Sequence, residues 1–319
     1  IKILVKAEGQ KFFDQVNEEF SNILTRDVDG AAHIIPQAEF DRVSASFVFP
    51  AAVQAHAPSG NGLPADASEA EQKQFAKWLE RNVRGHKVQG YKNVTLSVKR
   101  PGQAPGDVTD TQMDAIADMA DRFSCGELRV THDQNALLPF VREEDLYALW
   151  QAAKAATLAS PNIGLLSDMI ACPGGDFCAL ANARSIPIAN DLIERYQDLD
   201  ELYDIGEIDL HISGCINSCG HHHSGHIGIL GVDKDGSEWY QITLGGSDGS
   251  NHAPTSVVGK VIGPSFSADE VTDVIEAVIE TYRAQRSANE KFIDTVKRIG
   301  IDPFKIAANA VRRATAKAA

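Results

Sequence analysis

Four cysteines in two close pairs constrain this chain more than any other feature. Cys172 and Cys178 lie within Cys-Pro-Gly-Gly-Asp-Phe-Cys, and Cys215 and Cys219 lie within Cys-Ile-Asn-Ser-Cys. Five residues separate the first two thiols and three separate the second two. Glycine and proline flank the pairs, which is typical of loops whose backbone wraps closely around a ligand. If both loops face one cavity, the four thiolates can hold an iron–sulfur cluster or a zinc ion.

Two plainer interpretations compete with a cluster. Structural zinc sites commonly place two to four residues between paired cysteines, so the second pair fits zinc and the first is wide for it. Histidines 221, 222, 223 and 226 follow the second pair, so a mixed cysteine and histidine zinc site is an alternative. Free cysteines are also often buried as small apolar residues, and we expect this of the fifth cysteine, Cys125.

Composition and charge narrow the function classes. The 319 residues suffice for two or three domains, and no apolar run approaches the ~20 residues that span a bilayer. A net charge of −14 argues against a nucleic-acid-binding protein, because phosphates require a positive surface. Clustered cysteines without a disulfide framework predict a reducing cytoplasm. The first residues lack Met and resemble the middle of a helix, so we expect a piece of a longer protein.

The pattern of apolar residues predicts three regions, over residues 1–67, 68–160 and 161–319. The first begins with a helix over residues 8–26, where apolar residues recur at helical spacing. A short alternating stretch follows over residues 45–49. A linker rich in Ala, Pro, Gly and Ser then ends this region.

The second region alternates helix and strand. The expected elements are a helix, a strand, a helix, a strand and a helix, over residues 69–84, 94–98, 110–123, 127–131 and 143–157. Asp110 is the expected N-cap of the middle helix. This order predicts an α+β fold in which helices cover one face of a sheet.

In the third region each cysteine pair follows a short apolar segment. These segments span residues 165–171 and 208–212, and a helix is expected between them over residues 186–196. Asp235-Gly236, a favoured two-residue turn, predicts a β-hairpin of strands 227–232 and 238–244. Amphipathic helices are expected from residue 267 to the end.

Two motifs together resemble the sirohaem-containing sulfite and nitrite reductases. The cysteine spacing is similar to their cluster motif, within Ala-Cys-Pro-Gly-Gly-Asp-Phe-Cys (171–178) and Ser-Gly-Cys-Ile-Asn-Ser-Cys-Gly-His-His-His (213–223). Gly-Glu-Leu-Arg-Val-Thr-His-Asp-Gln-Asn (126–135) resembles a strand motif of their ferredoxin-like half-domain. The likeness runs from Phe75 to Phe304 and looks greatest to the bacterial assimilatory sulfite reductase haemoproteins.

That resemblance implies a fold for this chain and indicates which part of the family's enzyme the chain corresponds to. The family joins two related halves, each a ferredoxin-like half-domain followed by a larger α/β domain. This chain resembles the second half, preceded by the tail of the first. We therefore expect an α+β protein, with a ferredoxin-like half-domain and then a sirohaem and [4Fe–4S] α/β domain that ends in helices.

The resemblance also implies the cofactors and their ligands. Cys172, Cys178, Cys215 and Cys219 match the ligands of a [4Fe–4S] cluster, and Cys219 matches the cysteine that also binds the sirohaem iron. Further positions match residues that contact sirohaem: Ala171, Ser213, Asn217 and Gln134. We expect Arg129 instead to be exposed to solvent or paired in a salt bridge.

The implied reaction is the six-electron reduction of sulfite to sulfide, or of nitrite to ammonia, and the cysteine context favours sulfite. The electron donor would be a ferredoxin or an NADPH-fed flavoprotein, because no nicotinamide motif occurs. The family's distal Lys and Arg residues belong to its first half, so Lys99 and Arg100 are not assigned that role. An iron–sulfur electron carrier without haem and a zinc-stabilised module are the alternatives.

The histidine run His221–His223 departs from some relatives of the family. We expect a partly exposed loop there. Proton delivery is a second hypothesis, because imidazole titrates near neutral pH.

Overall fold

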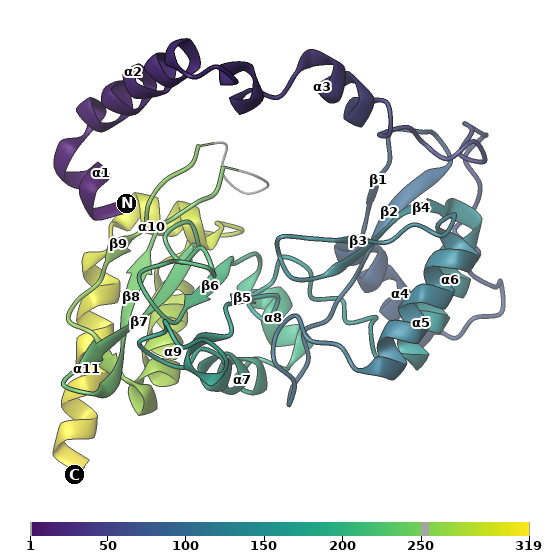
Figure 1. Cartoon of the computed structure of the whole chain (residues 1–319). Helices are drawn as coiled ribbons and strands as arrows, with labels where there is room; N and C mark the ends of the chain where they lie inside the picture. Colours follow the sequence, from purple (N-terminus) through teal and green to yellow (C-terminus); the bar gives the residue numbers. More distant parts are fainter. Residues whose placement is uncertain (1, 250–254, 319) are drawn as a thin grey trace. The chain divides into compact units, whose positions relative to one another are not determined.

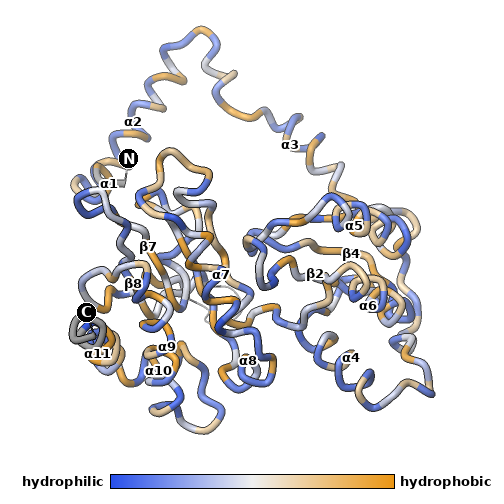
Figure 2. Tube along the Cα trace, turned by 90° about the horizontal axis from the view of Figure 1, so that it is seen from below, coloured by the Kyte–Doolittle hydropathy of each residue, from blue (hydrophilic) through white to orange (hydrophobic). Residues whose placement is uncertain are grey.

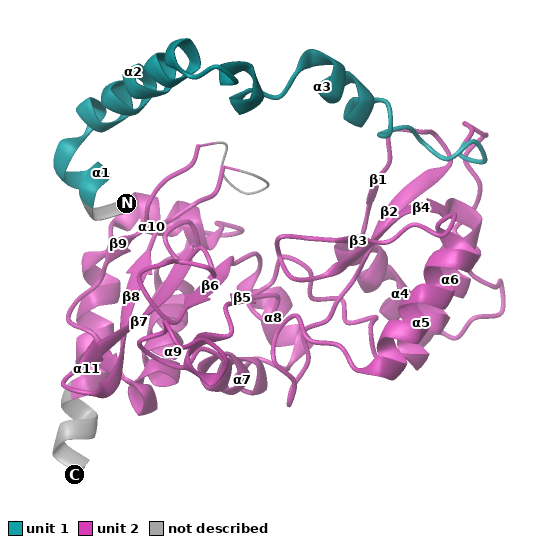
Figure 3. Ribbon diagram, in the orientation of Figure 1, with its two compact units in different colours: residues 1–53 teal, residues 54–319 magenta. Residues whose placement is uncertain are grey.

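A computed structural model describes residues 2–249 and 255–318. The chain forms two compact units, residues 1–53 and residues 54–319, and each is described by itself (Figure 3). The three regions predicted from the sequence stay a prediction. Within the described residues, no helix combines the length and the apolar character that crossing a membrane requires.

Unit 1 consists of helices that bury few side chains. Its elements are α1 (Lys2–Glu8), α2 (Gln10–Arg26), a 3-10 turn (Gly30–His33) and α3 (Gln37–Ser44). The long helix α2 confirms the one predicted over residues 8–26. No residue of α2 or α3 is buried, and the apolar stripe Phe13, Val16 and Phe20 is between 43% and 50% exposed. The alternating stretch over residues 45–49 is a turn and irregular chain rather than a strand, and its apolar side chains are exposed.

The first sheet of unit 2 is antiparallel, with strand order β1-β2-β4-β3. Its strands are β1 (Val83–Gly85), β2 (Tyr91–Leu96), β3 (Arg129–Val130) and β4 (Ala136–Arg142). Three helices pack with it: α4 (Glu69–Asn82), α5 (Asp110–Phe123) and α6 (Leu146–Ala155) (Figure 1). Large side chains from all three helices and both long strands form one core, which includes Trp78, Leu96, Ile116, Leu138 and Trp150. This is the predicted α+β arrangement.

Local differences from the sequence prediction have physical causes. Thr109, not Asp110, is the N-cap of α5, because its Oγ1 accepts the backbone N–H of Gln112 while the Gln112 side chain accepts the N–H of Thr109. A capping box needs Glu or Gln three residues after the cap, and Thr109 meets that spacing where Asp110 does not. The predicted strand over 127–131 shortens to two residues because Glu127 and Thr131 bond into turns.

The prediction of a buried Cys125 is wrong. Cys125 is exposed, in the turn that follows α5. Its φ of 55° and that of 74° at Gly126 reverse the chain at the surface. Helix ends commonly use such left-handed residues, and this placement carries the thiol away from the core.

The second sheet holds both cysteine pairs. Its strands follow the order β10-β8-β7-β6-β5, with β9 beside β8. They are β5 (Ile170–Ala171), β6 (Leu210–Ser213), β7 (Ile227–Lys234), β8 (Ser237–Leu244), β9 (Lys260–Val261) and β10 (Phe266–Ser267). Strands β5, β6 and β7 are parallel, and β7 and β8 form the predicted hairpin. Asp235 and Gly236 both have positive φ, 55° and 79°, as a type I′ turn requires.

Helices complete this part of the fold. They are α7 (Ile186–Arg195), α8 (Leu199–Ile205), α9 (Ala268–Gln285), α10 (Phe292–Ile299) and α11 (Asp302–Ala318), with a 3-10 turn at Gly174–Asp176. The last three confirm the predicted helical C-terminal region. Apolar side chains of α7, α9 and α10 bury against the inner strands in a second core. Hydrophobic segments accordingly concentrate along the strands and the inner helix faces (Figure 2).

Candidate functional site

Both cysteine pairs begin at the same edge of the second sheet. Cys172 directly follows β5, and Cys215 follows β6 after a single glycine. Because β5 and β6 are parallel neighbours, their carboxyl ends lie side by side. Ligand sites of open α/β sheets form at such ends. The fold therefore starts the two loops from adjacent points.

Backbone hydrogen bonds tie the two cysteine loops to each other through a third segment. The N–H groups of Asn182 and Ala183 both donate to the carbonyl of Gly214, at 2.9 and 3.1 Å. The carbonyl of Ala183 in turn accepts the N–H of Gly175 at 2.9 Å. Residues 182–183 thus bridge the first loop to the second.

Two glycines permit this close approach. A Cβ on Gly214 would lie 2.6 Å from the carbonyl oxygen of Ala183 and 2.8 Å from Cα of Gly174. A Cβ on Gly174 would lie 2.4 Å from the backbone nitrogen of Ser185. Such distances are not tolerated against backbone atoms, so side chains at either position would separate the loops.

Cys172 has the surroundings of a metal-binding thiolate. Its Sγ accepts the backbone N–H of Gly214 at 3.1 Å and lies 3.5 Å from the hydroxyl of Ser185, which is fully buried. Hydrogen bonds to sulfur are one of the means by which proteins set the potential of an iron–sulfur cluster. Sequence reasoning missed Ser185, because nothing in the local motif marks a residue 13 positions away.

The four thiols differ in exposure. Cys215 is buried, Cys172 and Cys178 are half-buried, and Cys219 is exposed. Large apolar side chains beside them are also exposed: Phe177 (81%), Leu180 (72%) and Ile216 (57%). Each cysteine loop therefore exposes a large apolar side chain, Phe177 in the first and Ile216 in the second.

Loop 213–223 is closed by its own polar groups. The Ser213 hydroxyl, which is buried, accepts the N–H of Gly220 at 3.1 Å. Ser218 and His221 both have positive φ, 59° and 55°, so the chain reverses tightly on either side of Cys219. Asn217, at the tip, is exposed. Of the residues predicted to contact sirohaem here, Asn217 is therefore accessible and Ser213 is enclosed.

Gln134 and Ala171, which the sequence proposed separately, touch each other. The Gln134 side-chain amide donates to the Ala171 carbonyl at 2.8 Å and accepts the Ala171 N–H at 2.9 Å. Gln134 lies in the turn between β3 and β4 of the first sheet, and Ala171 ends β5 of the second. This contact joins the two sheets directly beside Cys172.

The histidine run matches the expected partly exposed loop. His221 and His223 are exposed, whereas His222 is buried and its Nδ1 lies 3.2 Å from the Ser218 hydroxyl. The main-chain carbonyl of His221 accepts a hydrogen bond from Nδ1 of His211 on β6, at 3.0 Å. Burial lowers the pKa of His211, so its ring favours the neutral form.

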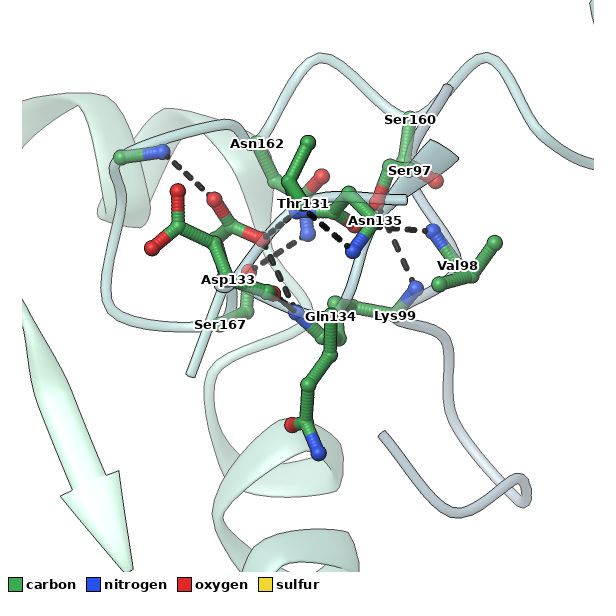
Figure 4. A network of polar contacts seen from close by, with 12 residues as sticks. Ser97, Val98, Lys99, Thr131, Asp133, Gln134, Asn135, Ser160, Asn162 and Ser167 are labelled. Carbon is green, nitrogen blue, oxygen red and sulfur yellow. Dashed lines mark hydrogen bonds and ion pairs between the residues drawn. The ribbon is translucent and has the colours of Figure 1, made fainter. Parts of the chain in front are cut away.

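Basic residues near the site are held in structural contacts. Lys99 Nζ is fully buried and lies 3.2 Å from Asp168 Oδ1, and it also donates to the carbonyl of Asp133 at 2.6 Å. Asn135 donates to the same Asp168 oxygen at 2.8 Å, as part of the polar network that Figure 4 shows. Arg129 pairs with Glu127, as expected of a salt-bridged residue.

Among the described residues, no preformed site for a single metal ion is present. A structural zinc ion needs four donors at about 2.0 to 2.3 Å from one point. No three His, Cys, Asp or Glu side chains among the described residues come together closely enough to hold a single ion. A cubane cluster has a different requirement, because each thiolate binds its own iron and the sulfurs lie farther apart.

Comparison with known families matches most of unit 2. Residues 87–156 match the nitrite/sulfite reductase ferredoxin-like half domain, and residues 167–313 match the nitrite and sulphite reductase 4Fe-4S domain. Together the two family models cover more than half of the chain. The second match contains all four paired cysteines.

Individual relatives are named as nitrite reductases or as sulfite reductases, and each matches a similar share of this chain. An assimilatory ferredoxin-dependent nitrite reductase of Haloferax mediterranei is 28% identical over 62% of this chain and 34% of its own length. "Sulfite reductase [ferredoxin] 2" of Mycolicibacterium paratuberculosis is 29% identical over 68% of this chain and 40% of its own. The solved structure of the NirA protein of Mycobacterium tuberculosis superposes with a TM-score of 0.56 at 25% identity, over 70% of this chain and 41% of that one.

The chain spans between a third and two fifths of the length of these two curated relatives. The first match contains β2, β3 and β4 of the first sheet, and the second contains all strands of the second sheet with both cysteine loops. The chain therefore belongs to the nitrite and sulfite reductase family.

Proposed function

We propose that Cys172, Cys178, Cys215 and Cys219 ligate a [4Fe–4S] cluster. The observation that carries this proposal is the start of both cysteine loops at the adjacent carboxyl ends of β5 and β6, where backbone bonds through residues 182–183 link them. The donor set suits the group, because four thiolates are the usual ligands of such a cluster. The N–H of Gly214 directed at Cys172 Sγ supports it further, and so does the close backbone packing of the two loops that Gly174 and Gly214 permit.

Membership of the family implies a [4Fe–4S] cluster and sirohaem as the cofactors. We infer that Cys219 is the thiolate shared between them, since it is exposed at the loop surface and can reach a second group. Asn217, exposed beside it, is the accessible contact for the macrocycle. Ser213 and Ala171 are buried beneath, so we propose that they shape the base of this surface together with Gln134.

For the whole protein we propose reduction of sulfite to sulfide with six electrons, and nitrite reduction to ammonia is the alternative. When bound, the two cofactors would supply activation of the anion and transfer of single electrons. Cys172, Cys178, Cys215 and Cys219 would hold the cluster, and Cys219 stays accessible for the second group. The Cys-Pro-Gly-Gly-Asp-Phe-Cys context favours sulfite.

A ferredoxin is the proposed electron donor, because curated relatives are named as ferredoxin-dependent, and an NADPH-fed flavoprotein is the second candidate. We further propose a cytoplasmic location. The proposed domains are residues 68–160 for the half-domain and 161–319 for the cofactor domain, after a leading segment over 1–67.

The cluster is tested by anaerobic purification with assays of iron and acid-labile sulfide. We expect about four labile sulfides per chain and cluster absorption, with sirohaem bands in the cofactor-loaded protein. Cys215→Ser should lose most of the labile sulfide. Cys125→Ser is the matched control, because its thiol is exposed in a turn that follows α5, and it should keep the cluster. A colourless zinc-containing wild type, or equal sulfide in both variants, would overturn the proposal.

The choice of anion is tested by difference spectra of the whole cofactor-loaded protein, because the distal Lys and Arg residues that the resemblance implies belong to the family's first half. Sulfite and nitrite are titrated separately, and sulfite should perturb the haem bands at the lower concentration. Tighter binding of nitrite would replace sulfite as the proposed substrate.

A further inference from the structure

Strand β5, which ends just before the first cysteine, is an edge strand of the second sheet among the described residues. It pairs with β6 on one side, where the N–H of Cys172 donates to the carbonyl of Ile212 at 3.1 Å. Because successive residues of a strand direct their N–H and C=O groups to opposite sides, both backbone groups of Ala171 point away from β6. Ala171 is buried, so these groups need partners.

One side chain supplies both partners. The Gln134 amide accepts the Ala171 N–H at 2.9 Å and donates to the Ala171 carbonyl at 2.8 Å. This is the pair of bonds that a neighbouring strand would make, provided here by a single residue of the other sheet.

The Gln134 side chain is itself held in place. The residue has a φ of 57°, which is uncommon and costly outside glycine, and its N–H donates to the Thr131 carbonyl at 3.1 Å. Gly106 packs against it, since a Cβ there would lie 3.0 Å from the Gln134 Cβ. A strained backbone that other contacts stabilise is a reason to look for a function of the residue.

We propose that Gln134 is a positioning residue for Cys172: by fixing both backbone groups of Ala171, it fixes the direction in which the next residue presents its thiol. The part that concerns the cluster rests on the function proposed above. A tilt of the Ala171–Cys172 peptide would move Cys172 Sγ relative to the N–H of Gly214, 3.1 Å away. That hydrogen bond is one of the contacts through which the protein sets the reduction potential.

The geometric part is tested by amide hydrogen exchange of the full chain. Gln134→Leu removes both hydrogen bonds, and Gln134→Asn keeps the amide and shortens its reach. In both variants the Ala171 amide should exchange at least tenfold faster than in the wild type, while amides of β7 and β8 stay unchanged.

Gln151→Leu is the matched control. This variant removes a side-chain amide that donates to Glu71 and to the Tyr147 hydroxyl, in helices that pack on the first sheet. The Ala171 amide should therefore exchange at the wild-type rate. Unchanged Ala171 exchange in Gln134→Asn would overturn the proposal, and so would equally rapid exchange in Gln151→Leu. If Gln134→Leu does not fold, Gln134→Asn alone decides, because it keeps a polar residue that tolerates positive φ.

The cluster part is tested by the reduction potential and the electron paramagnetic resonance spectrum of the reduced protein. Both should shift in Gln134→Asn and stay unchanged in Gln151→Leu, at equal labile sulfide. An unshifted potential with faster Ala171 exchange would overturn the link to Cys172. Absence of labile sulfide in the wild type would instead contradict the proposed function and leave the exchange result standing.

Discussion

Cys215 and Cys219 lie in one short loop, yet the surroundings of their thiols differ. Cys215 follows β6 into the interior and is buried, whereas the chain reverses at Ser218 and carries Cys219 to the surface. Identical residue types thus gain different access to solvent and to ligands from backbone conformation alone. This difference underlies the separate roles that we propose for the two sulfurs.

The buried side chain of His211 predicts how the stability of the protein depends on pH. Burial lowers its pKa in the folded protein below the ordinary value, so the unfolded chain binds more protons as the pH falls through about 6.5. The stability that the neutral ring contributes is therefore fully present above that pH. It is lost progressively as the pH falls from there to the lowered pKa of the folded protein. The free-energy difference of unfolding between wild type and His211→Asn should be smaller at pH 5.5 than at pH 7.5.

Urea unfolding at the two pH values measures this difference. A difference between wild type and His211→Asn that is the same at both would contradict the buried neutral state of the ring. A larger difference at pH 5.5 would show that the folded protein stabilises the protonated form.

At the scale of elements, short-range chemistry determined where helices begin. Thr109 and Gln112 satisfy each other's backbone N–H groups at the start of α5, and Ser267 and Glu270 do the same for α9. Both boxes precede a helix whose inner face is apolar. The capping hydrogen bonds and the burial of the apolar helix face therefore favour the same first residue for each helix.

Thr109→Ala should lower the free energy of unfolding by about 1 kcal/mol, because the N–H of Gln112 loses its acceptor. Urea unfolding followed by circular dichroism measures it. Thr281→Ala is the matched control, since this threonine lies within α9, where its hydroxyl bonds only the Ala277 carbonyl four residues earlier. An equal loss in both variants would show that the cap is not the cause.

For unit 2 as a whole, a buried ion pair connects the two sheets. The side chain of Lys99, which follows β2, is fully buried, and that of Asp168, just before β5, is 6% exposed. Asp168 also accepts hydrogen bonds from Asn135 and from the N–H of Gly164, so its charge is well partnered. The network holds the first sheet against the segment that leads into Cys172 (Figure 4).

Removing one charge of the Lys99–Asp168 pair should lower the free energy of unfolding far more than removing both charges. Lys99→Met leaves Asp168 buried without its cation and should cost about 3–5 kcal/mol. The double variant Lys99→Met/Asp168→Leu should recover part of this loss, because no unpaired charge remains. A double-mutant cycle from urea unfolding measures the coupling. Additive losses would show that the pair is not coupled.

Much of the fold was predictable because its signals are local. Helix α2, the three C-terminal helices and the hairpin at Asp235-Gly236 followed from apolar spacing and turn chemistry over a few residues. Strand β4 and the short length of β3 did not, since a strand depends on partners that are distant in the sequence. Cys125 was misplaced for a related reason: composition indicates that cysteines are often buried, and only the chain reversal after α5 puts this one outside.

By itself, the sequence determined the identity and spacing of the four cysteines, the glycines that their loops require, and the resemblance that the family matches confirm. Tertiary structure alone decided that β5 and β6 are adjacent and parallel, that Ser185 lies beside Cys172, and that Gln134 binds Ala171. The physical reason is the distance along the chain over which each kind of interaction acts. Turn and helix preferences act between neighbours along the chain, whereas sheet order and buried hydrogen bonds join residues that only the folded core brings together.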